Sequence, residues 1–502
     1  MRLVMAQYYH LGGKDEMPSM LHQSVILRVK TAADLFNPLV FALRIVAVLR
    51  IPTFCAFFAL APLVTAMELK PLALYQSGFA AGTEIVSVQA SSMRVIVSNS
   101  AEGLVDILQL DPAKGLNRMA RHSLVAADAG EITSAIFHPS EDLFAVCIRN
   151  SDGLKNGRVE FRAAADGKLL NTVEIGIWPD SLAFSPKGDF VVVANEGEGY
   201  VRDGEGFLSG EGSISLIDLR GGVAAAKHSL ITLPDLAGVE GATQAEHKRL
   251  VERVIDGEEL KVPFGTSPEH IEPEYVIFSP DGARAYVSLQ ENNAIAVVDI
   301  LQGKLDKVFG LGIVRHAADT LDDGKYEPSG ELFALREPDA LAVSADGRYL
   351  ISADEGDTDP KIAKTKAGLP SGGGRTVSVF DAISGKLLGD TASQLDDMAA
   401  EAGVYPDARS PNKGSEPEGV VSFDAFGKRL VVATLERADA LALIDLDQPA
   451  QPKVLQVIGA GEGAGSGELA PEGLVHVEHN GRHFLVTALE KSGNVALFEL
   501  LK

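Results

Sequence analysis

The sequence predicts an all-β protein, and within that class a seven-bladed β-propeller formed by residues 67–502. Two bulk features favour β-structure: aromatic residues make up only 6% of the 502 residues, and 50 glycines suit many short strands joined by turns. The third observation is an internal repeat that occurs seven times after residue 80. Repeated strand units without intervening helices are typical of the four-stranded blades of a propeller.

Each copy of the repeat contains an acidic residue, an apolar strand, a glycine-containing turn, a second apolar strand and a third strand that often ends in aspartate. Alternating apolar residues on both sides of a short turn predict β-hairpins. The clearest copies cover residues 178–219, 272–300, 336–386, 416–446 and 470–500. Weaker copies begin near Glu84 and Glu131, which brings the count to seven.

The spacing of the copies predicts insertions between and within the blades. The acidic residues that begin successive copies, which we call the leading acidic residues, are 47 to 94 residues apart. The longer intervals therefore contain extra segments. The largest insertion contains residues 239–260, whose apolar spacing predicts a helix. Other insertions lie near 312–335, 357–374 and 388–415, and the sequences 195–198 and 354–359 predict acidic loops.

The two ends of the repeat region predict how the ring closes. The last copy stops after its third strand at Leu500, whereas residues 69–76 have a strand-like pattern and no blade of their own. We expect this early strand to complete the seventh blade, because closure of the ring protects sheet edges that would otherwise invite aggregation.

Residues 1–66 predict an N-terminal extension that ends in a secretory signal peptide. Residues 51–66 form an uncharged apolar run that follows Arg44 and Arg50 and ends at Ala66, where we expect cleavage. Sixteen residues are short for a bilayer span, which makes a permanent anchor the weaker alternative. We expect the mature protein to be a bacterial periplasmic or secreted monomer without a stable membrane span.

The net charge narrows the choice of partners. Residues 1–66 hold six basic and three acidic side chains, so the rest of the chain has 39 basic and 66 acidic side chains and a net charge of −27. Nucleic acid and anionic membranes need a positive protein surface and are poor partners for this chain. Cys147 is the single cysteine after residue 66, which rules out a disulfide within the mature chain.

Two series of acidic residues predict a cation site. The first strand of each propeller blade lines the central channel, and seven carboxylates lead these strands: Glu84, Glu131, Asp180, Glu274, Asp339, Glu418 and Glu472. A second series follows 16 to 18 residues later in five copies, at Glu196, Glu291, Glu355, Glu436 and Glu490. Because a hairpin returns the chain to the same end of its blade, we expect both series at one mouth of the channel.

Crowded carboxylates repel one another unless cations or protons neutralise them, and oxygen ligands of this kind suit Ca²⁺ or another hard divalent cation. The predicted metal ligands are Glu196, Glu274, Glu291, Asp339, Glu355, Glu418, Glu436 and Glu472. In the alternative interpretation, these residues only cap backbone groups of the neighbouring blade.

Three arginines beside the acidic positions are candidates for phosphate binding, or else for pairing with the carboxylates: Arg149, Arg336 and Arg437. The catalytic residues are unknown at this stage. The sequence contains neither a Gly-x-Ser-x-Gly elbow nor a Walker A loop.

Several strings within the repeats resemble the choice-of-anchor I family of secreted proteins. They begin at Ala194 (ANEGE), Glu272 (EPEY), Leu289 (LQENNAIAVVD), Ala353 (ADEGD), Asn412 (NKGSEPEG) and Leu469 (LAPEGL). The resemblance covers nearly all of residues 80–500 and implies an extracytoplasmic propeller. Members are described as alkaline-phosphatase-like or as similar to mesenchyme-specific cell-surface glycoproteins linked to calcium mineral. This chain has Asp354 where members commonly have asparagine.

Two functional hypotheses follow from the residues and the resemblance. The first is an exported propeller that binds a divalent cation, Ca²⁺, at the channel mouth and binds or hydrolyses small-molecule phosphate esters there as a metal-dependent phosphomonoesterase. The second is a non-enzymatic scaffold that binds an extracellular protein, polysaccharide or mineral. Turnover that depends on metal would distinguish the first hypothesis from the second.

Overall fold

The computed structural model describes residues 67–124, 130–197, 200–202, 206–208, 210–243, 250–255, 258–263, 268–356, 370–461 and 465–502. The predicted signal peptide in residues 1–66 and the acidic residues 357–359 lie outside this described part. The propeller falls within the compact unit Val64–Lys502.

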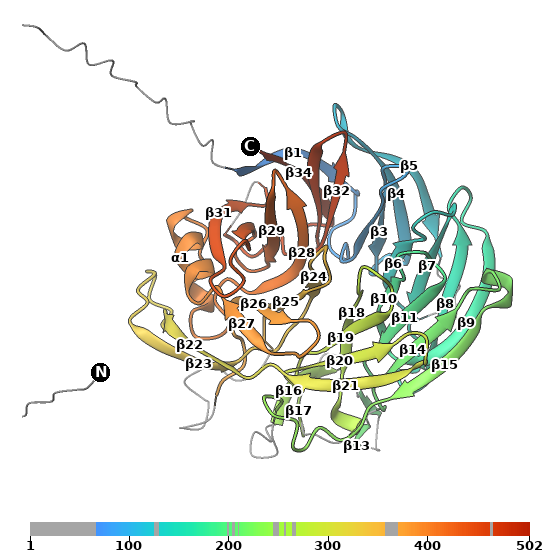
Figure 1. Ribbon diagram of the computed structural model, residues 1–502, viewed down its shortest axis with the longest axis horizontal. Coiled ribbons are helices and arrows are strands. Elements are labelled where there is room, and N and C mark those ends of the chain that lie inside the picture. The colour runs from blue at the N-terminus through green and yellow to red at the C-terminus, as the bar shows by residue number, and fades with distance from the viewer. Residues whose placement is uncertain are drawn as a thin grey trace, which may run out of the picture. The chain divides into compact units, whose positions relative to one another are not determined.

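Seven antiparallel sheets of four strands each form the blades of a propeller, which confirms the predicted fold (Figure 1). The inner strands of blades 1 to 7 are β2 (Val86–Gln89), β6 (Ile132–Phe137), β10 (Pro179–Phe184), β18 (Pro273–Phe278), β24 (Leu341–Val343), β28 (Pro417–Ala425) and β32 (Pro471–His479). Each inner strand contacts the inner strand of the next blade, and β32 contacts β2, so the ring of inner strands is closed.

The remaining strands of each blade follow outward in a regular order. The second strands are β3 (Arg94–Asn99), β7 (Leu143–Ile148), β11 (Phe190–Asn195), β19 (Arg284–Leu289), β25 (Tyr349–Asp354), β29 (Lys428–Leu435) and β33 (Arg482–Leu489). The third strands are β4 (Leu104–Asp111), β8 (Asn156–Ala163), β14 (Ser213–Asp218), β20 (Ala294–Asp299), β26 (Thr376–Asp381), β30 (Ala440–Asp445) and β34 (Asn494–Leu501). The outer strands are β5 (Gly115–Ser123), β9 (Leu169–Ile177), β15 (Lys227–Thr232), β21 (Lys304–Gly310), β27 (Leu387–Asp390), β31 (Lys453–Gly459) and, in blade 7, β1 (Glu68–Gln76).

Blade 7 is completed by the earliest strand of the described chain, as predicted. β1 pairs antiparallel with β34, from Glu68 opposite Leu501 to Gln76 opposite Asn494, and the two lie side by side in Figure 1 in blue and red. Gln456 of blade 6 also binds β1, because its side chain accepts a hydrogen bond from the Leu69 amide at 2.7 Å and donates one to the Leu69 carbonyl at 3.2 Å. The strand that closes the ring is therefore tied to two blades.

The hydrophobic core is divided among the seven blade junctions. Each junction has its own cluster of buried apolar side chains drawn from both of its blades. Middle strands pack against a neighbouring blade on both faces, so they read as continuous apolar runs, and β7, with the sequence LFAVCI, is buried at every position. Cys147 is one of these buried residues, and burial raises the pKa of its thiol well above the usual range.

The insertions differ from the prediction in one respect. Residues 250–263 contain the hairpin of β16 (Leu250–Ile255) and β17 (Glu258–Pro263), so the helix predicted across 239–260 was wrong. Asp256-Gly257 separates the two strands in the sequence, and this dipeptide is a typical hairpin signal. Two more hairpins are β12 (Tyr200–Arg202) with β13 (Gly206–Leu208), and β22 (Ile313–Ala318) with β23 (Gly330–Leu335).

Helical structure in the described residues is limited to one α-helix and three short 3-10 turns. The α-helix is α1 (Gln394–Glu401), and the 3-10 turns are η1 (Val223–Ala225), η3 (Pro268–His270) and η5 (Asp407–Arg409). None of the helices in the described chain has the length and apolar character needed to span a membrane.

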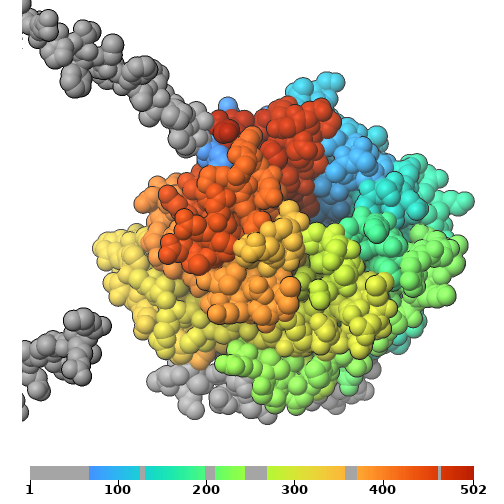
Figure 2. All heavy atoms as spheres, in the orientation of Figure 1, coloured from blue at the N-terminus to red at the C-terminus, as the bar shows by residue number. Residues whose placement is uncertain are grey.

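The two insertions that flank blade 5 in sequence pack against each other. The Tyr326 hydroxyl donates to Asp397 of α1 at 2.7 Å, and the rings of Tyr326 and Tyr405 meet edge to face with centroids 4.5 Å apart. The Gly324 amide donates to Asp407 at 2.6 Å. These insertions lie on the rim of the propeller, where the yellow and orange surfaces of Figure 2 meet.

Candidate metal centre

Both series of carboxylates lie at the same end of the ring of inner strands, which we call the channel mouth. All seven leading carboxylates are half-buried at the start of an inner strand or just before it. The second series begins the connection between the second and third strands of its blade. In three blades the backbone amide of the second carboxylate donates to a carbonyl two residues before the leading one: Glu196 to Trp178 (2.8 Å), Glu436 to Glu416 (2.7 Å) and Glu490 to Ala470 (2.8 Å).

The residues that accept these backbone bonds have an unusual conformation. Trp178, Glu416 and Ala470 each lie two positions before a leading carboxylate, and all have left-handed backbone, with φ of 51°, 60° and 51°. L-residues rarely adopt this region, and it persists where the surrounding structure enforces it. The same backbone turn therefore precedes the leading carboxylate in each of these three blades.

Repulsion and burial raise the proton affinity of the mouth. Burial, followed by the charges of neighbouring carboxylates, raises the pKa of Glu274, Asp339, Glu418 and Glu472 well above the usual range. Burial likewise raises the pKa of Glu84 to about 7 and that of Glu436 to about 8. The neighbours that act on these groups include members of both series from blades 1 to 7, so the ring forms one electrostatic unit.

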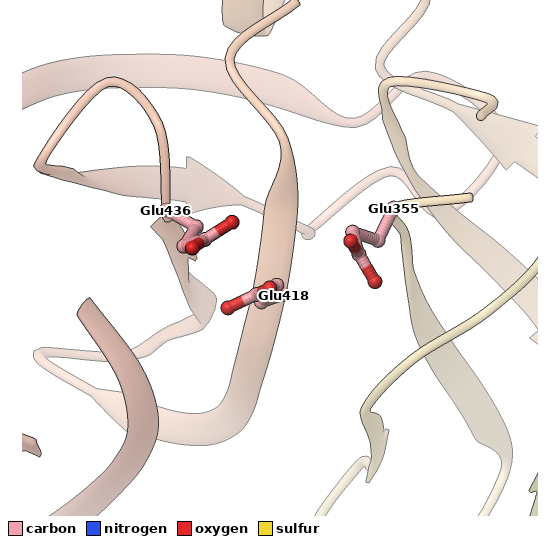
Figure 3. Close-up of side chains that lie close together, drawn as sticks. All are labelled: Glu355, Glu418 and Glu436. Carbon is pink, nitrogen blue, oxygen red and sulfur yellow. The ribbon is translucent and has the colours of Figure 1, made fainter. Parts of the chain in front are cut away.

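Three of the predicted ligands come together at the junction of blades 5 and 6, and we call them the carboxylate trio. Glu355 follows β25, Glu418 lies on β28 and Glu436 follows β29 (Figure 3). One oxygen from each lies within 4.8 Å of the others, and this is the only such group of His, Cys, Asp or Glu in the described chain. Two oxygens bound to one Ca²⁺ ion at 2.3–2.6 Å are at most about 5 Å apart, so the spacing fits a shared ion.

Unsatisfied oxygens provide a second test of that fit. Oε2 of Glu418 and Oε2 of Glu436 are buried and accept no hydrogen bond from the described residues. An anionic oxygen in this state is costly unless a proton or a cation compensates it. The trio therefore has the donor chemistry and the spacing of a site for a hard divalent cation, and two of its buried oxygens accept no hydrogen bond from the described residues.

The other predicted ligands belong to the ring but not to the trio. Glu196, Glu274, Glu291, Asp339 and Glu472 act on one another or on the trio through their charges. Glu291 is 2% exposed, and Oε2 of Glu274 is buried without a hydrogen bond from the described residues.

Sequence reasoning missed the cation that lies against the trio. The buried Lys413 side chain donates hydrogen bonds to Oε1 of Glu355 and to the Gly356 carbonyl, the latter at 2.9 Å, and its Nζ lies 3.1 Å from Oε1 of Glu416. Lys413 belongs to the string NKGSEPEG, of which only the acidic positions were interpreted. The lysine in that string was the available signal.

Glu416 is the carboxylate with the most complete set of counter-charges. It is buried, and burial opposes ionisation, but Lys413, Arg409 and Arg437 hold its pKa below the usual range. Arg409 binds it with two hydrogen bonds, at 3.0 and 2.9 Å. Glu416 therefore acts as an internal anion that fixes three cations beside the trio.

The three predicted phosphate-binding arginines have different environments. Arg437 is 26% exposed and binds Glu436 at 2.6 Å. Arg149 pairs with Glu131 and stacks over Trp178, with its guanidinium carbon 4.3 Å from the ring centroid.

Arg336 lies inside blade 5 and is separated from the mouth. It is 1% exposed and binds Asp354, Asp390 and Ser378, at 3.4, 2.9 and 2.5 Å. Because its donors are directed to acceptors within blade 5 and the segment before it, we leave Arg336 out of the proposed site.

Comparisons with known proteins identify the family, and one solved propeller domain is similar in fold. No curated protein matches the sequence. Among solved structures, the β-propeller domain of Cps50 (Swd1) from Myceliophteria thermophila is similar at 11% identity and a TM-score of 0.50, over 86% of this chain and all of that one. Kuenenia stuttgartiensis hydrazine synthase is similar at 14% identity and a TM-score of 0.49, over 85% of this chain and 99% of that one.

The sequence itself matches one family description in two overlapping segments, residues 84–368 and 364–449. These segments include all members of the carboxylate trio, and they extend from the leading residue of blade 1 into blade 6. The chain therefore belongs to the choice-of-anchor I domain family.

Proposed function

We propose that this protein is an exported propeller that binds Ca²⁺ through Glu355, Glu418 and Glu436 at the channel mouth. The observation that carries the proposal is the meeting of three carboxylate oxygens within 4.8 Å, two of whose side chains keep a buried oxygen without a hydrogen bond from the described residues. The family indicates an extracellular or cell-surface bacterial protein. Export would proceed through the signal peptide predicted in residues 51–66.

The ligand chemistry favours Ca²⁺ over other ions. An all-carboxylate site lacks the thiolate and imidazole ligands typical of zinc, and Ca²⁺ accepts the irregular geometry that three side chains from two blades provide. Lys413 and Arg437 already compensate part of the negative charge of the trio. Partial compensation weakens the site, which suits the roughly 0.1–1 mM affinities of extracellular calcium modules.

The described geometry supports binding better than catalysis. Arg437 and Lys413, the cations nearest the trio, are themselves bound by carboxylates. We therefore place first the non-enzymatic form of the proposal, in which the calcium-loaded mouth binds an extracellular protein, polysaccharide or mineral. Such a ligand would complete the coordination of the ion with its own oxygens.

Phosphate-ester hydrolysis is the second form of the proposal, and one observation favours it. Arg437 and Lys491 pair with Glu436, at 2.6 and 3.7 Å from its Oε1, and their side chains are 26% and 42% exposed. They could hold phosphoryl oxygens beside the trio. A bound divalent ion supplies polarisation of a phosphoryl oxygen.

Calorimetric titration of the purified protein with Ca²⁺ at pH 8 tests the binding proposal. We expect one site in the wild type and at least about a tenfold loss of affinity in Glu418→Gln, which keeps the shape of the side chain and removes its charge. Glu84→Gln removes a ring carboxylate outside the trio and is the matched control, with affinity within about threefold of the wild type. Absence of binding in the wild type, or unchanged binding in Glu418→Gln, would overturn the proposal.

Turnover of a generic phosphomonoester separates the two forms. The same purified protein is assayed with Ca²⁺ and then with excess chelator. Turnover that chelator removes and Glu418→Gln abolishes would support the hydrolase. A protein that binds Ca²⁺ without turnover is the scaffold.

A further inference from the structure

Lys413 binds the same carboxylate that the proposed calcium ion would use. Its ammonium group donates to Oε1 of Glu355, one of the three residues of the trio. The Gly356 carbonyl at 2.9 Å and Oε1 of Glu416 at 3.1 Å complete the acceptors around Nζ. The lysine therefore occupies the blade 5 side of the trio as a cation that belongs to the chain itself.

The loop that carries Lys413 is fixed on both sides by buried contacts. The Arg375 guanidinium donates to the carbonyls of Ser410 and Asn412, at 2.6 and 2.8 Å. On the other side, the amide and hydroxyl of Ser415 donate to Asp396 of α1, at 3.0 and 2.7 Å. Arg375 of blade 5 and α1 thus hold residues 410–415 in place, and this loop positions Lys413 beside the trio.

The charges around the trio show what this lysine does to a second cation. Four carboxylates meet here, Glu355, Glu416, Glu418 and Glu436, and four cations pair with members of this group, Arg409, Lys413, Arg437 and Lys491. With every group ionised, the four positive and four negative charges cancel, and the cluster would keep one negative charge without Lys413. A divalent ion must therefore share Glu355 with an ammonium group at close range, where like charges repel strongly.

We infer that Lys413 is a built-in competitor of the metal ion, which pairs with Glu355 when the ion is absent and weakens the binding of Ca²⁺ to the trio. This inference rests on the proposed calcium site. It makes Lys413 the residue that sets the affinity range and thereby the calcium concentration at which the mouth is loaded. Calcium binding then releases the ammonium group from Glu355, while Glu416 keeps it in the cluster.

Lys413→Gln and Lys413→Arg test the inference by calorimetry with Ca²⁺. The glutamine retains a polar side chain without charge, and we expect it to increase the affinity at least about tenfold. The arginine retains the charge, and we expect affinity within about threefold of the wild type. Folded Lys413→Gln protein that binds Ca²⁺ no more tightly than the wild type would overturn the inference.

A labelling experiment on the wild type avoids any dependence on how the variants fold. The rate of lysine acetylation at Lys413 is measured by mass spectrometry with and without saturating Ca²⁺. Lys428 serves as the internal control, because it pairs with Asp445 and Asp447 and lies at the opposite end of β29 from Glu436. We expect Ca²⁺ to increase the labelling of Lys413 several-fold and to leave Lys428 unchanged. Equal labelling of Lys413 at saturation would contradict the release of the lysine.

The outcomes also separate this inference from the proposed function. If calcium binding is lost in Glu418→Gln but is not enhanced in Lys413→Gln, the proposed calcium site stands and the competition by Lys413 is refuted. Calcium binding in Lys413→Gln alone would show that the lysine closes the site of the wild-type protein, which overturns the proposed function and upholds the competition.

Discussion

Arg375 and Asp396 form an ion pair, with Nη1 3.3 Å from Oδ2, and neither side chain is appreciably exposed to solvent. The arginine lies just before β26 of blade 5, and the aspartate lies on α1 in the insertion before blade 6. Arg375 also donates to the Asp319 carbonyl at 3.0 Å, so one guanidinium joins both insertions that flank blade 5. The position of the Lys413 loop depends on this pair.

Substitution of this arginine is expected to destabilise the protein strongly. Arg375→Met leaves the buried Asp396 without its counter-charge, and we expect a loss of about 3–5 kcal/mol in the free energy of unfolding. Arg220→Met removes an exposed partner of Asp218 and should cost less than about 1 kcal/mol. Chemical denaturation measures the free energy of unfolding of both variants. Equal losses would show that the buried ion pair stabilises the protein no more than the exposed one.

The closing strand provides a second prediction about stability. Leu69 on β1 is 1% exposed and packs in the cluster between blades 6 and 7. Leu69→Ala should reduce the free energy of unfolding by about 2–5 kcal/mol, because the cavity persists after the side chain is removed. Leu72 is on the same strand but 40% exposed, so Leu72→Ala should change stability by less than about 0.5 kcal/mol. A similar cost for both residues would argue against the closure of the ring by β1.

The carboxylates at the mouth predict how calcium stabilisation depends on pH. Burial raises the pKa of Glu418 well above its usual range and that of Glu436 to about 8, so the folded protein retains protons that the unfolded chain loses near pH 4.5. Without metal, this contribution to stability is complete below about pH 4.5 and is lost as the pH rises towards 8. Calcium binds the ionised form, so the increase in the unfolding temperature caused by Ca²⁺ should be larger at pH 8 than at pH 5. An increase that is independent of pH would contradict this linkage.

A histidine pair on the hairpin of blade 7 predicts the opposite dependence at lower pH. His476 stacks on Phe423 with centroids 3.8 Å apart, and its Nε2 lies 3.1 Å from Nδ1 of His483. Burial and the neighbouring His483 lower the pKa of His476 to about 3. As the pH falls through 6.5, His476 therefore becomes protonated in the unfolded chain but stays neutral in the folded protein. Its contribution to the free energy of unfolding decreases by at most about 1.4 kcal/mol per pH unit between pH 6.5 and pH 3.

His476→Phe tests that contribution, because phenylalanine preserves the stacking and cannot titrate. Unfolding by denaturant at pH 7, 6 and 5 should give a shallower loss of stability in the variant than in the wild type. Parallel curves would show that the histidine pair does not titrate on unfolding.

The features that could be predicted from the sequence are those that recur in each blade. The blades, the strand at residues 69–76 and both carboxylate series follow from a short pattern that recurs, because each copy must bury the same faces and place its first strand in the ring. The helix predicted across 239–260 failed because a short apolar run can satisfy either periodicity, and the segment folds as β16 and β17.

The composition of the trio could not be read from the sequence, because it depends on tertiary contacts. Eight carboxylates were predicted as ligands, but only a distance between blades selects Glu355, Glu418 and Glu436. The sequence left two roles open for Arg336, phosphate binding or pairing with carboxylates, and only the packing of blade 5 shows that it pairs with Asp354 and Asp390. Lys413 reaches the trio through an insertion whose contacts have no signature in the repeat.

Crystals of the protein grown with Sr²⁺, an ion that takes the oxygen ligands of Ca²⁺, test the central claim most directly. We expect one strong peak in the anomalous difference map, within about 2.6 Å of a carboxylate oxygen from each of Glu355, Glu418 and Glu436. A map without a peak at the channel mouth, with Lys413 still bound to Glu355, would contradict the assignment of this trio as the metal centre.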